Sequence, residues 1–127
     1  MVEVSVVSRF HNDDKNMKDV LDILNYAWVP QIISRLDYYG QLRFNQLKRS
    51  IRGISSTSLS RSLSLLHGKG LLRRTVYETS PPKVTYALSV KGQDIGRIMA
   101  SVLETGKKWN SVKTEELEVK DSTARSC

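Results

Sequence analysis

The spacing of apolar residues divides the chain into helical segments followed by a pair of strands. At the start, Val2, Val4 and Val6 alternate with polar residues, and this period of two predicts a short strand or an arm over residues 1–15. Beyond this segment, apolar residues recur every three or four positions, which is typical of amphipathic helices. The pattern predicts helices over 17–24, 28–39, 44–50 and 56–67.

Glycine and serine mark where these helices begin and end. Gly53 lies in a tight turn and can adopt the positive φ that such turns often need. Ser55 or Ser56 follows as the N-cap of the fourth helix, because a serine hydroxyl accepts a hydrogen bond from a free backbone N–H. Gly68 or Gly70 can end that helix in the left-handed conformation. The sequence therefore predicts two helices joined by a short turn.

Two strands and a long helix complete the pattern. Apolar and polar residues favour strands over 71–78 and 84–89. A final helix follows Lys91-Gly92, and the polar residues 111–127 are expected to be a frayed or disordered tail. Residues 16–110 are then one mainly helical domain with a small β-hairpin wing, an α+β fold of the winged helix-turn-helix type, with helices on either side of the motif.

The distribution of charge points to a function for this fold. Residues 38–110 carry thirteen basic and three acidic side chains, a net charge of +10, whereas the whole chain carries +7. Between Tyr38 and Tyr77 there are eight basic residues and no Asp or Glu. A folded segment that excludes acid on this scale is typical of a surface that binds a polyanion, and nucleic acid is the first candidate. The alternative is a basic face that is merely solvated.

The predicted helix over 56–67 has the composition of a helix that enters the major groove of DNA. Leu59, Leu63 and Leu66 lie on one side and predict its buried face. Small hydroxyl residues elsewhere on the helix would allow close approach to base edges, and Arg61 can form two parallel hydrogen bonds to guanine. We therefore expect the base-reading surface to consist of Ser55, Ser56, Thr57, Ser60, Arg61 and Ser64.

Basic residues flank this helix where the DNA backbone would pass. Because Arg73 and Arg74 are neighbours on a strand, they point to opposite faces, and we expect only one of them to meet DNA directly. For Arg43, a solvated surface charge or a contact within the domain is an equal alternative. The residues expected to contact phosphate are Arg43, Lys48, Arg49, Arg52, Arg73, Arg74 and Lys83.

Several segments between about Trp28 and Trp109 occur in a specific order and spacing. They include Arg43-Phe44-Asn45-Gln46-Leu47-Lys48-Arg49, Gly53-Ile54-Ser55, Gly70-Leu71-Leu72-Arg73-Arg74 and Pro81-Pro82-Lys83-Val84-Thr85-Tyr86-Ala87-Leu88. In these segments the chain resembles the HxlR family of winged-helix regulators, relatives of the MarR family. The resemblance implies a homodimeric DNA-binding transcription regulator of prokaryotic type, whose two recognition helices read a palindromic site in double-stranded DNA.

In such regulators the first and last helices build the dimer. The corresponding segments of this chain carry more apolar residues than a small domain needs to cover, although some of them must serve the core of the protomer. The residues that the resemblance assigns to dimerisation are Val20, Leu21, Leu24, Ile95, Ile98, Met99, Val102, Leu103 and Trp109.

The chain also departs from the family pattern. Tyr26-Ala27-Trp28 stands where the family usually has Gly-Lys-Trp. No cysteine precedes the first helix, so thiol-based sensing at that position is excluded. Gln46, His67 and Thr85 stand where family members often have acidic residues, which we interpret as a stronger attraction to phosphate.

Other classes of function find no support in the sequence. It contains no pair of catalytic carboxylates, no nucleophile with a base and no phosphate-binding loop, so we expect neither an enzyme nor a cofactor. Its two histidines and one cysteine lack zinc-ligand spacing, and no segment approaches a membrane span. One terminal cysteine and the absence of a signal-peptide pattern favour the cytoplasm. An architectural DNA-binding protein and a protein–protein interaction module remain as alternatives to a sequence-specific regulator.

Overall fold

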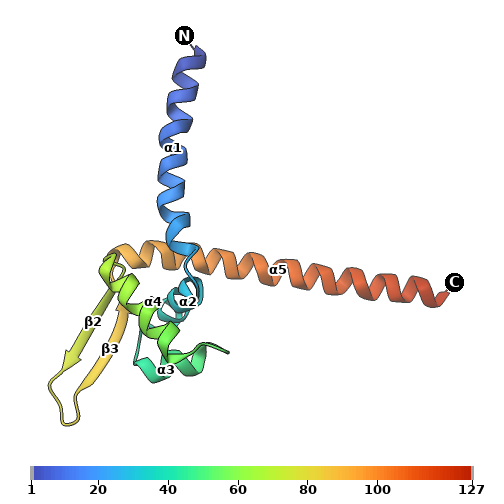
Figure 1. Ribbon diagram of the computed structural model, residues 1–127. Helices are drawn as coiled ribbons and strands as arrows, with labels where there is room; N and C mark the ends of the chain where they lie inside the picture. The colour runs from blue at the N-terminus through green and yellow to red at the C-terminus, as the bar shows by residue number, and fades with distance from the viewer. Residues whose placement is uncertain (1, 127) are drawn as a thin grey trace.

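The computed structural model describes residues 2–126, and the side chains of residues 10–111. The helices are α1 (Val2–Leu24), α2 (Val29–Tyr39), α3 (Phe44–Ser50), α4 (Ser56–Gly68) and α5 (Val90–Ser126). The strands β1 (Gln41–Leu42), β2 (Leu72–Tyr77) and β3 (Lys83–Leu88) form one antiparallel sheet in the order β1-β3-β2. In Figure 1, α2, α3, α4 and the sheet form a packed body from which α1 and α5 extend in different directions. The predicted fold class is confirmed.

Both ends of the described chain are helical. The short strand or arm expected over residues 1–15 is wrong, because α1 is a single helix that begins at Val2. A strand needs a partner for its backbone N–H and C=O groups, whereas a helix pairs them internally. At the other end α5 continues to Ser126, over the residues expected to be a frayed helix or disordered. Residues 107–126 contain no glycine or proline that would interrupt a helix.

The core is built on α2, whose four aliphatic residues point inward. Val29, Ile32, Ile33 and Leu36 have helical i, i+3, i+4, i+7 spacing, and none is more than 1% exposed. They form one cluster with residues from α3, the following turn, α4, the hairpin and α5, namely Leu47, Ile51, Ile54, Leu59, Leu63, Leu66, Leu71, Leu72, Leu88, Ile95 and Met99. The position of α4 relative to the hairpin is therefore set by a shared core.

The start of α5 approaches the base of the hairpin very closely. The backbone N–H of Ser89 donates to the carbonyl of Leu71 at 3.0 Å, and the Ser89 hydroxyl donates to the carbonyl of Gly70 at 2.6 Å. A Cβ atom added at Gly92 would lie 2.1 Å from the Leu71 carbonyl oxygen. Only glycine permits this approach, so Gly92 allows α5 to lie directly against the base of the hairpin.

Two glycines in turns have positive φ angles, as their positions in the sequence predict. Gly53, between α3 and α4, has φ 87°, as predicted. Gly70 rather than Gly68 takes the left-handed conformation after α4, with φ 75°. The N–H of Leu71 then donates to the carbonyl of Leu66 at 2.9 Å, which closes the helix end.

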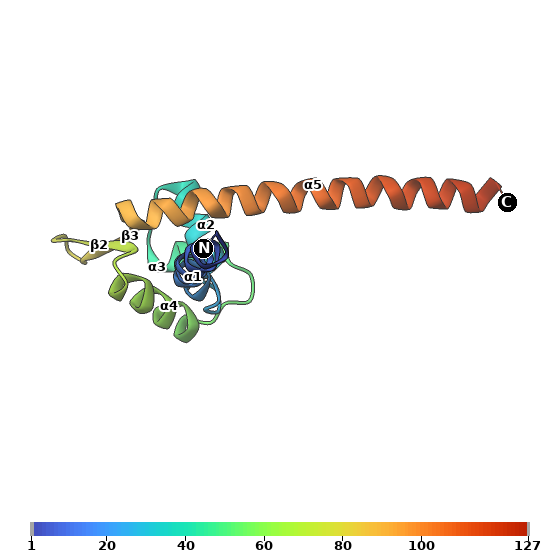
Figure 2. The same ribbon diagram turned by 90° about the horizontal axis from the view of Figure 1, so that it is seen from above.

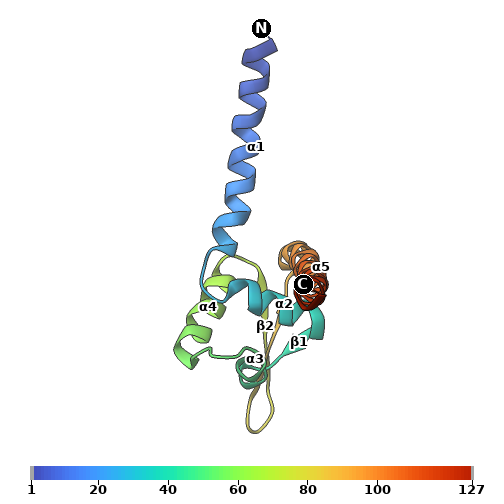
Figure 3. The ribbon, with the colours of Figure 1, turned by 90° about the vertical axis from the view of Figure 1, so that its right-hand side faces the viewer.

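α1 and the middle of α5 expose apolar side chains outside the body. Figure 2 shows α5 extending away from the body, and Figure 3 shows α1 extending away from it on the side opposite to the wing tip. The exposed residues are Phe10, Met17 and Leu21 on α1 and Ile98, Val102, Leu103 and Trp109 on α5. Ile95 and Met99, by contrast, are only 5% and 6% exposed and belong to the core of the protomer. The predicted dimerisation set is thus divided between the core and the surface, with Val20 and Leu24 half-buried.

Gly92→Ala is expected to lower the free energy of unfolding by about 1–3 kcal/mol, because its methyl group overpacks the contact with Leu71. Gly106→Ala is the matched control on the same helix, since its added Cβ would meet no atom within 4 Å and alanine favours a helix. Urea unfolding followed by circular dichroism measures both variants. Equal stability of the two variants would contradict the close packing at Gly92.

Candidate nucleic-acid interface

α3, the turn after it and α4 form a helix-turn-helix, with the hairpin beside it. Ile51 and Ile54 anchor the turn in the core, whereas Arg52 and Gly53 between them are exposed. β2 and β3 pair from Leu72 opposite Leu88 to Tyr77 opposite Lys83, and the hairpin projects from the body as a wing (Figure 1). The predicted motif and wing are both present.

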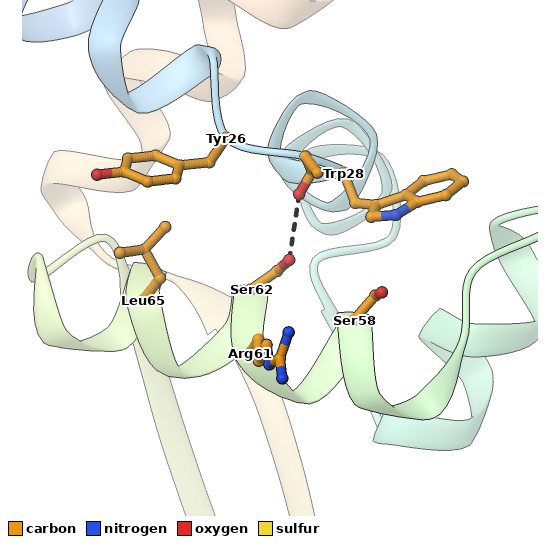
Figure 4. A pocket seen from close by; sticks show the side chains of 7 residues that line it. Tyr26, Trp28, Ser58, Arg61, Ser62 and Leu65 are labelled. Carbon is orange, nitrogen blue, oxygen red and sulfur yellow. Dashed lines mark hydrogen bonds between the residues drawn. The ribbon is translucent and has the colours of Figure 1, made fainter.

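The orientation of α4 is fixed on two sides and at its N-terminus. Its three core leucines, Leu59, Leu63 and Leu66, are no more than 3% exposed. On another side, the buried Ser62 hydroxyl donates to the Ala27 carbonyl at 3.2 Å and ties α4 to the loop between α1 and α2 (Figure 4). Ser55 is the N-cap, and its hydroxyl accepts from the Ser58 N–H at 3.0 Å. One side of α4 is then left for a ligand.

This free side of α4 lines an open groove of about 630 Å³. Among the described residues, no acidic side chain lines the groove, and the α4 residues in it are all exposed. Ser55 does not line it, because that residue caps the helix instead. The lining consists of Phe44 from α3 and five of the residues predicted to read bases: Ser56, Thr57, Ser60, Arg61 and Ser64. We call this groove the reading groove.

A second cleft connects α4 with the wing and distinguishes the two neighbouring arginines. It is lined by Phe44, Ser60, Leu63, Ser64, His67, Arg74 and Tyr86. Arg73 instead lines a cavity on the other face of the sheet, together with Asp37 of α2 and Arg97 of α5. Arg74 therefore shares a face with α4 and Arg73 does not, as expected for successive residues of a strand.

The other basic residues surround the motif without acidic partners. Arg43, Lys48, Arg49 and Arg52 are exposed. Within residues 10–111, no basic side chain between Tyr38 and Tyr77 forms an ion pair. The ion pairs found among residues 10–111 all lie within α1 or within α5. On the wing, the Lys83 ammonium lies 5.3 Å from the centre of the Tyr77 ring. The positive charge of the motif is thus available to an external anion.

Gln46 has a local structural role as well. Its side-chain oxygen accepts the backbone N–H of Arg43 at 2.8 Å, which stabilises the start of α3. Phe44 is half-buried and lines both clefts. Periodicity assigns an apolar residue to the buried side of a helix, but it does not reveal that the residue reaches the rim of a groove.

Comparison with known proteins agrees with this geometry. The family described as HxlR-like helix-turn-helix matches residues 23–114, more than two thirds of the chain. The chain belongs to the HxlR-like helix-turn-helix family. The HxlR resemblance of the sequence is thereby confirmed, and this HxlR-like chain is a transcriptional regulator with a helix-turn-helix DNA-binding domain rather than an enzyme.

Relatives and solved structures extend the match. The HTH-type transcriptional regulator YtfH of Escherichia coli (strain K12) is 32% identical over 108 residues, which cover 84% of this chain and 82% of YtfH. An HTH-type regulator of Methanothermobacter thermautotrophicus is 39% identical over 72 residues, covering 57% of this chain and 55% of that relative. A MarR-family regulator of Porphyromonas gingivalis W83 superposes with a TM-score of 0.67 at 31% identity, covering 72% of this chain and 88% of that one.

The redox regulator HypR in its oxidised form is also similar to this HxlR-like chain. It superposes with a TM-score of 0.68 at 28% identity, over 73% of this chain and 95% of HypR. Among the described residues no group of three or more His, Cys, Asp or Glu side chains is placed to hold a metal ion. None of the described helices has both the length and the apolar character needed to cross a membrane.

Ser55→Ala is expected to destabilise the protein by about 1 kcal/mol, because the N-terminus of α4 loses its cap. Ser56→Ala makes the same chemical change one residue later, where no described hydrogen bond depends on the hydroxyl, and should change stability by less than about 0.5 kcal/mol. Thermal unfolding of both variants by calorimetry tests this difference. A larger loss for Ser56→Ala would show that the cap is misassigned.

Proposed function

We propose that the chain acts as a dimeric, sequence-specific transcriptional regulator on double-stranded DNA. α4 enters the major groove and the wing contacts the flanking backbone. The observation that carries this proposal is the reading groove, where one arginine lies among small hydroxyl groups on a helix face without acid. A prokaryotic regulator of this kind acts in the cytoplasm, where the chromosome lies.

Within the reading groove, Arg61 has the chemistry that discriminates between bases. Its guanidinium can donate two hydrogen bonds to guanine, a contact worth about 1–3 kcal/mol of discrimination. Ser56, Thr57, Ser60 and Ser64 are small enough to let the helix backbone approach the base edges. The position of Ser55 at the cap favours a structural role for it over base contact.

Phosphate contacts come from the residues on either side of α4. Lys48, Arg49 and Arg52 are exposed on α3 and its turn, where they can hold one strand of the backbone. On the wing, Arg74 is the better candidate than Arg73, because Arg74 lines the cleft shared with α4. Arg43 and Lys83 remain further candidates at the edges of the same face.

The dimer is formed by the apolar surfaces of α1 and α5 outside the body. Phe10 and Met17 on α1, and Val102 and Trp109 on α5, are each more than half exposed in a single protomer. Exposed apolar surface of this kind is typical of a protein–protein interface. Ile95 and Met99 support the interface from within the core rather than by direct contact. A symmetric pair of protomers then presents two recognition helices to a palindromic site.

Arg61→Ala is expected to reduce the preference for the operator over scrambled duplex by roughly 5- to 150-fold, because a guanine contact is lost. Lys48→Ala and Arg49→Ala should weaken both duplexes about equally and lower the slope of affinity against salt by about 1 for each phosphate contact removed. The operator is first selected from random duplexes, and fluorescence anisotropy at several salt concentrations measures each variant.

The same titration separates a regulator from an architectural DNA-binding protein. The unaltered chain should prefer its selected operator over scrambled duplex by about 10³ or more. Similar affinity for both duplexes would reject sequence-specific binding, and an equal loss of preference in all three variants would reject the separate role of Arg61.

Val102→Glu is expected to convert the dimer into monomers, because an unpaired carboxylate is placed within an apolar interface. Val90→Glu is the matched control on the same helix, since Val90 is 82% exposed and lies beside the hairpin base. Sedimentation velocity measures the mass of both variants. A dimer that survives Val102→Glu, or dissociates equally in Val90→Glu, would place the interface elsewhere.

A further inference from the structure

The cleft between α4 and the wing, which we call the wing cleft, gathers polar side chains from both elements. From α4 come Ser60, Ser64 and His67, whose i, i+4, i+7 spacing places them on one side of the helix. From the wing come Arg74 and Tyr86, which are partners in the pairing of β2 with β3. Among the described residues, no acidic side chain lines this cleft.

The polar side chains of the wing cleft are not used by the protein itself. Within residues 10–111, the side chains of Ser60, Ser64, His67, Arg74 and Tyr86 form no hydrogen bond and no ion pair with other residues. Hydroxyl, imidazole and guanidinium groups can all donate hydrogen bonds. Several donors therefore line one cleft that contains no carboxylate to accept from them, and this composition suits an anion.

The size and position of the wing cleft suit one phosphate of the DNA backbone. The cleft measures about 130 Å³, well below the roughly 300–1,000 Å³ of sites for drug-sized ligands. It shares Phe44, Ser60 and Ser64 with the reading groove, so the two hollows adjoin. His67 follows Arg61 by six residues of α4, or about 9 Å along the helix axis. A strand whose bases lie in the reading groove can therefore place a phosphate over the wing cleft.

His67 differs from the other cationic candidates because its charge depends on pH. Histidine is the side chain that ordinarily changes charge between about pH 5 and 8, whereas arginine keeps its charge throughout this range. His67 is exposed in the last turn of α4, so its ring is accessible to an external ligand. A phosphate attracts a protonated imidazole more strongly than a neutral one, so phosphate binding and proton uptake favour each other.

The groups that face His67 contain no acid to compete with a phosphate. β2 contributes Arg74 and β3 contributes Tyr86, while α3 contributes only the ring of Phe44. Lys69, the next charged residue along the chain, directs its ammonium to a tyrosine ring of the loop between α1 and α2, 5.7 Å from the ring centre. Arg74 is thus the permanent positive charge of the wing cleft, and His67 is the variable one.

We propose that the wing cleft holds one phosphate of the operator and that His67 binds it in the protonated form. Loss of the proton removes one positive charge from this contact, so DNA affinity falls as the pH rises from about 6 to about 8. This inference rests on the proposed function, since it adds a proton-dependent contact to the same DNA-binding surface. A histidine that served only the dipole at the end of α4 would change stability with pH but not the affinity for DNA.

Fluorescence anisotropy with the selected operator, at constant ionic strength, measures the affinity of the unaltered chain at about pH 6, 7 and 8. We expect the Kd to rise about tenfold over this range for each protomer bound, because a charge-assisted hydrogen bond is lost. The slope of affinity against salt should be steeper at the acidic end by about 0.9 for each protomer, since one more phosphate is neutralised there.

His67→Gln keeps a hydrogen-bond donor without the charge, so it should bind at about pH 6 as weakly as the unaltered chain does at about pH 8. His67→Lys carries a permanent charge and should bind tightly over the whole range. His11→Gln is the matched control, because His11 is the other histidine of the chain and lies exposed on α1. That control should keep the pH dependence of the unaltered chain.

A pH dependence that survives His67→Gln, or that disappears equally in His11→Gln, would overturn the role of His67. Equal affinity of the unaltered chain for its operator at every pH would overturn it as well, and so would weak binding by His67→Lys at about pH 8. None of these results affects the proposed function, because preference for the operator is intact in each. Failure of the unaltered chain to prefer operator over scrambled duplex at any pH would instead reject the proposed function.

Discussion

The burial of Leu59, Leu63 and Leu66 is the contact on which the rest of the DNA-facing surface depends. Their burial fixes the orientation of α4, so that its small hydroxyl residues and Arg61 face outward together. The Ser62 hydrogen bond to Ala27 then holds an adjacent side of the helix to the loop after α1. A recognition surface made of weakly interacting serines can keep one shape only because the opposite side of the helix is firmly packed. Removal of one such leucine side chain typically costs about 2–5 kcal/mol.

The sequence was informative wherever a pattern was repeated and had to be satisfied within one protomer. The helices of the motif, the hairpin and the turn at Gly53 all follow from local periodicity and backbone requirements. Alternation of Val2, Val4 and Val6 misled because three residues with the period of a strand do not supply a neighbouring strand. The sequence also did not show which apolar residues of α5 are buried and which are exposed. Ile95 and Ile98 have the same side chain, and only packing distinguishes the buried one from the exposed one. Likewise, no local signal distinguishes Arg73 from Arg74; the pairing register and the helix behind it do.

The absence of acidic residues between Tyr38 and Tyr77 of the sequence is also found, among the described residues, in the lining of the reading groove. A chain segment without acid leaves its arginines uncompensated, which suits phosphate, but the same condition makes the segment receptive to any small anion. Arg61 is exposed in the reading groove, and no acidic side chain lines that groove among the described residues.

The continuity of α5 has a consequence for the geometry of the operator. Its first residues are locked to the base of the wing through Ser89 and Gly92, and the same uninterrupted helix carries Val102 and Trp109 outward. In the proposed dimer, the length of α5 therefore sets the distance between the wing and the symmetry axis. One inserted residue between these regions would advance the outer part by about 1.5 Å and rotate it by about 100°. The spacing of the two operator half-sites, and their relative rotation about the DNA axis, would therefore depend on the length of a helix that contacts no base.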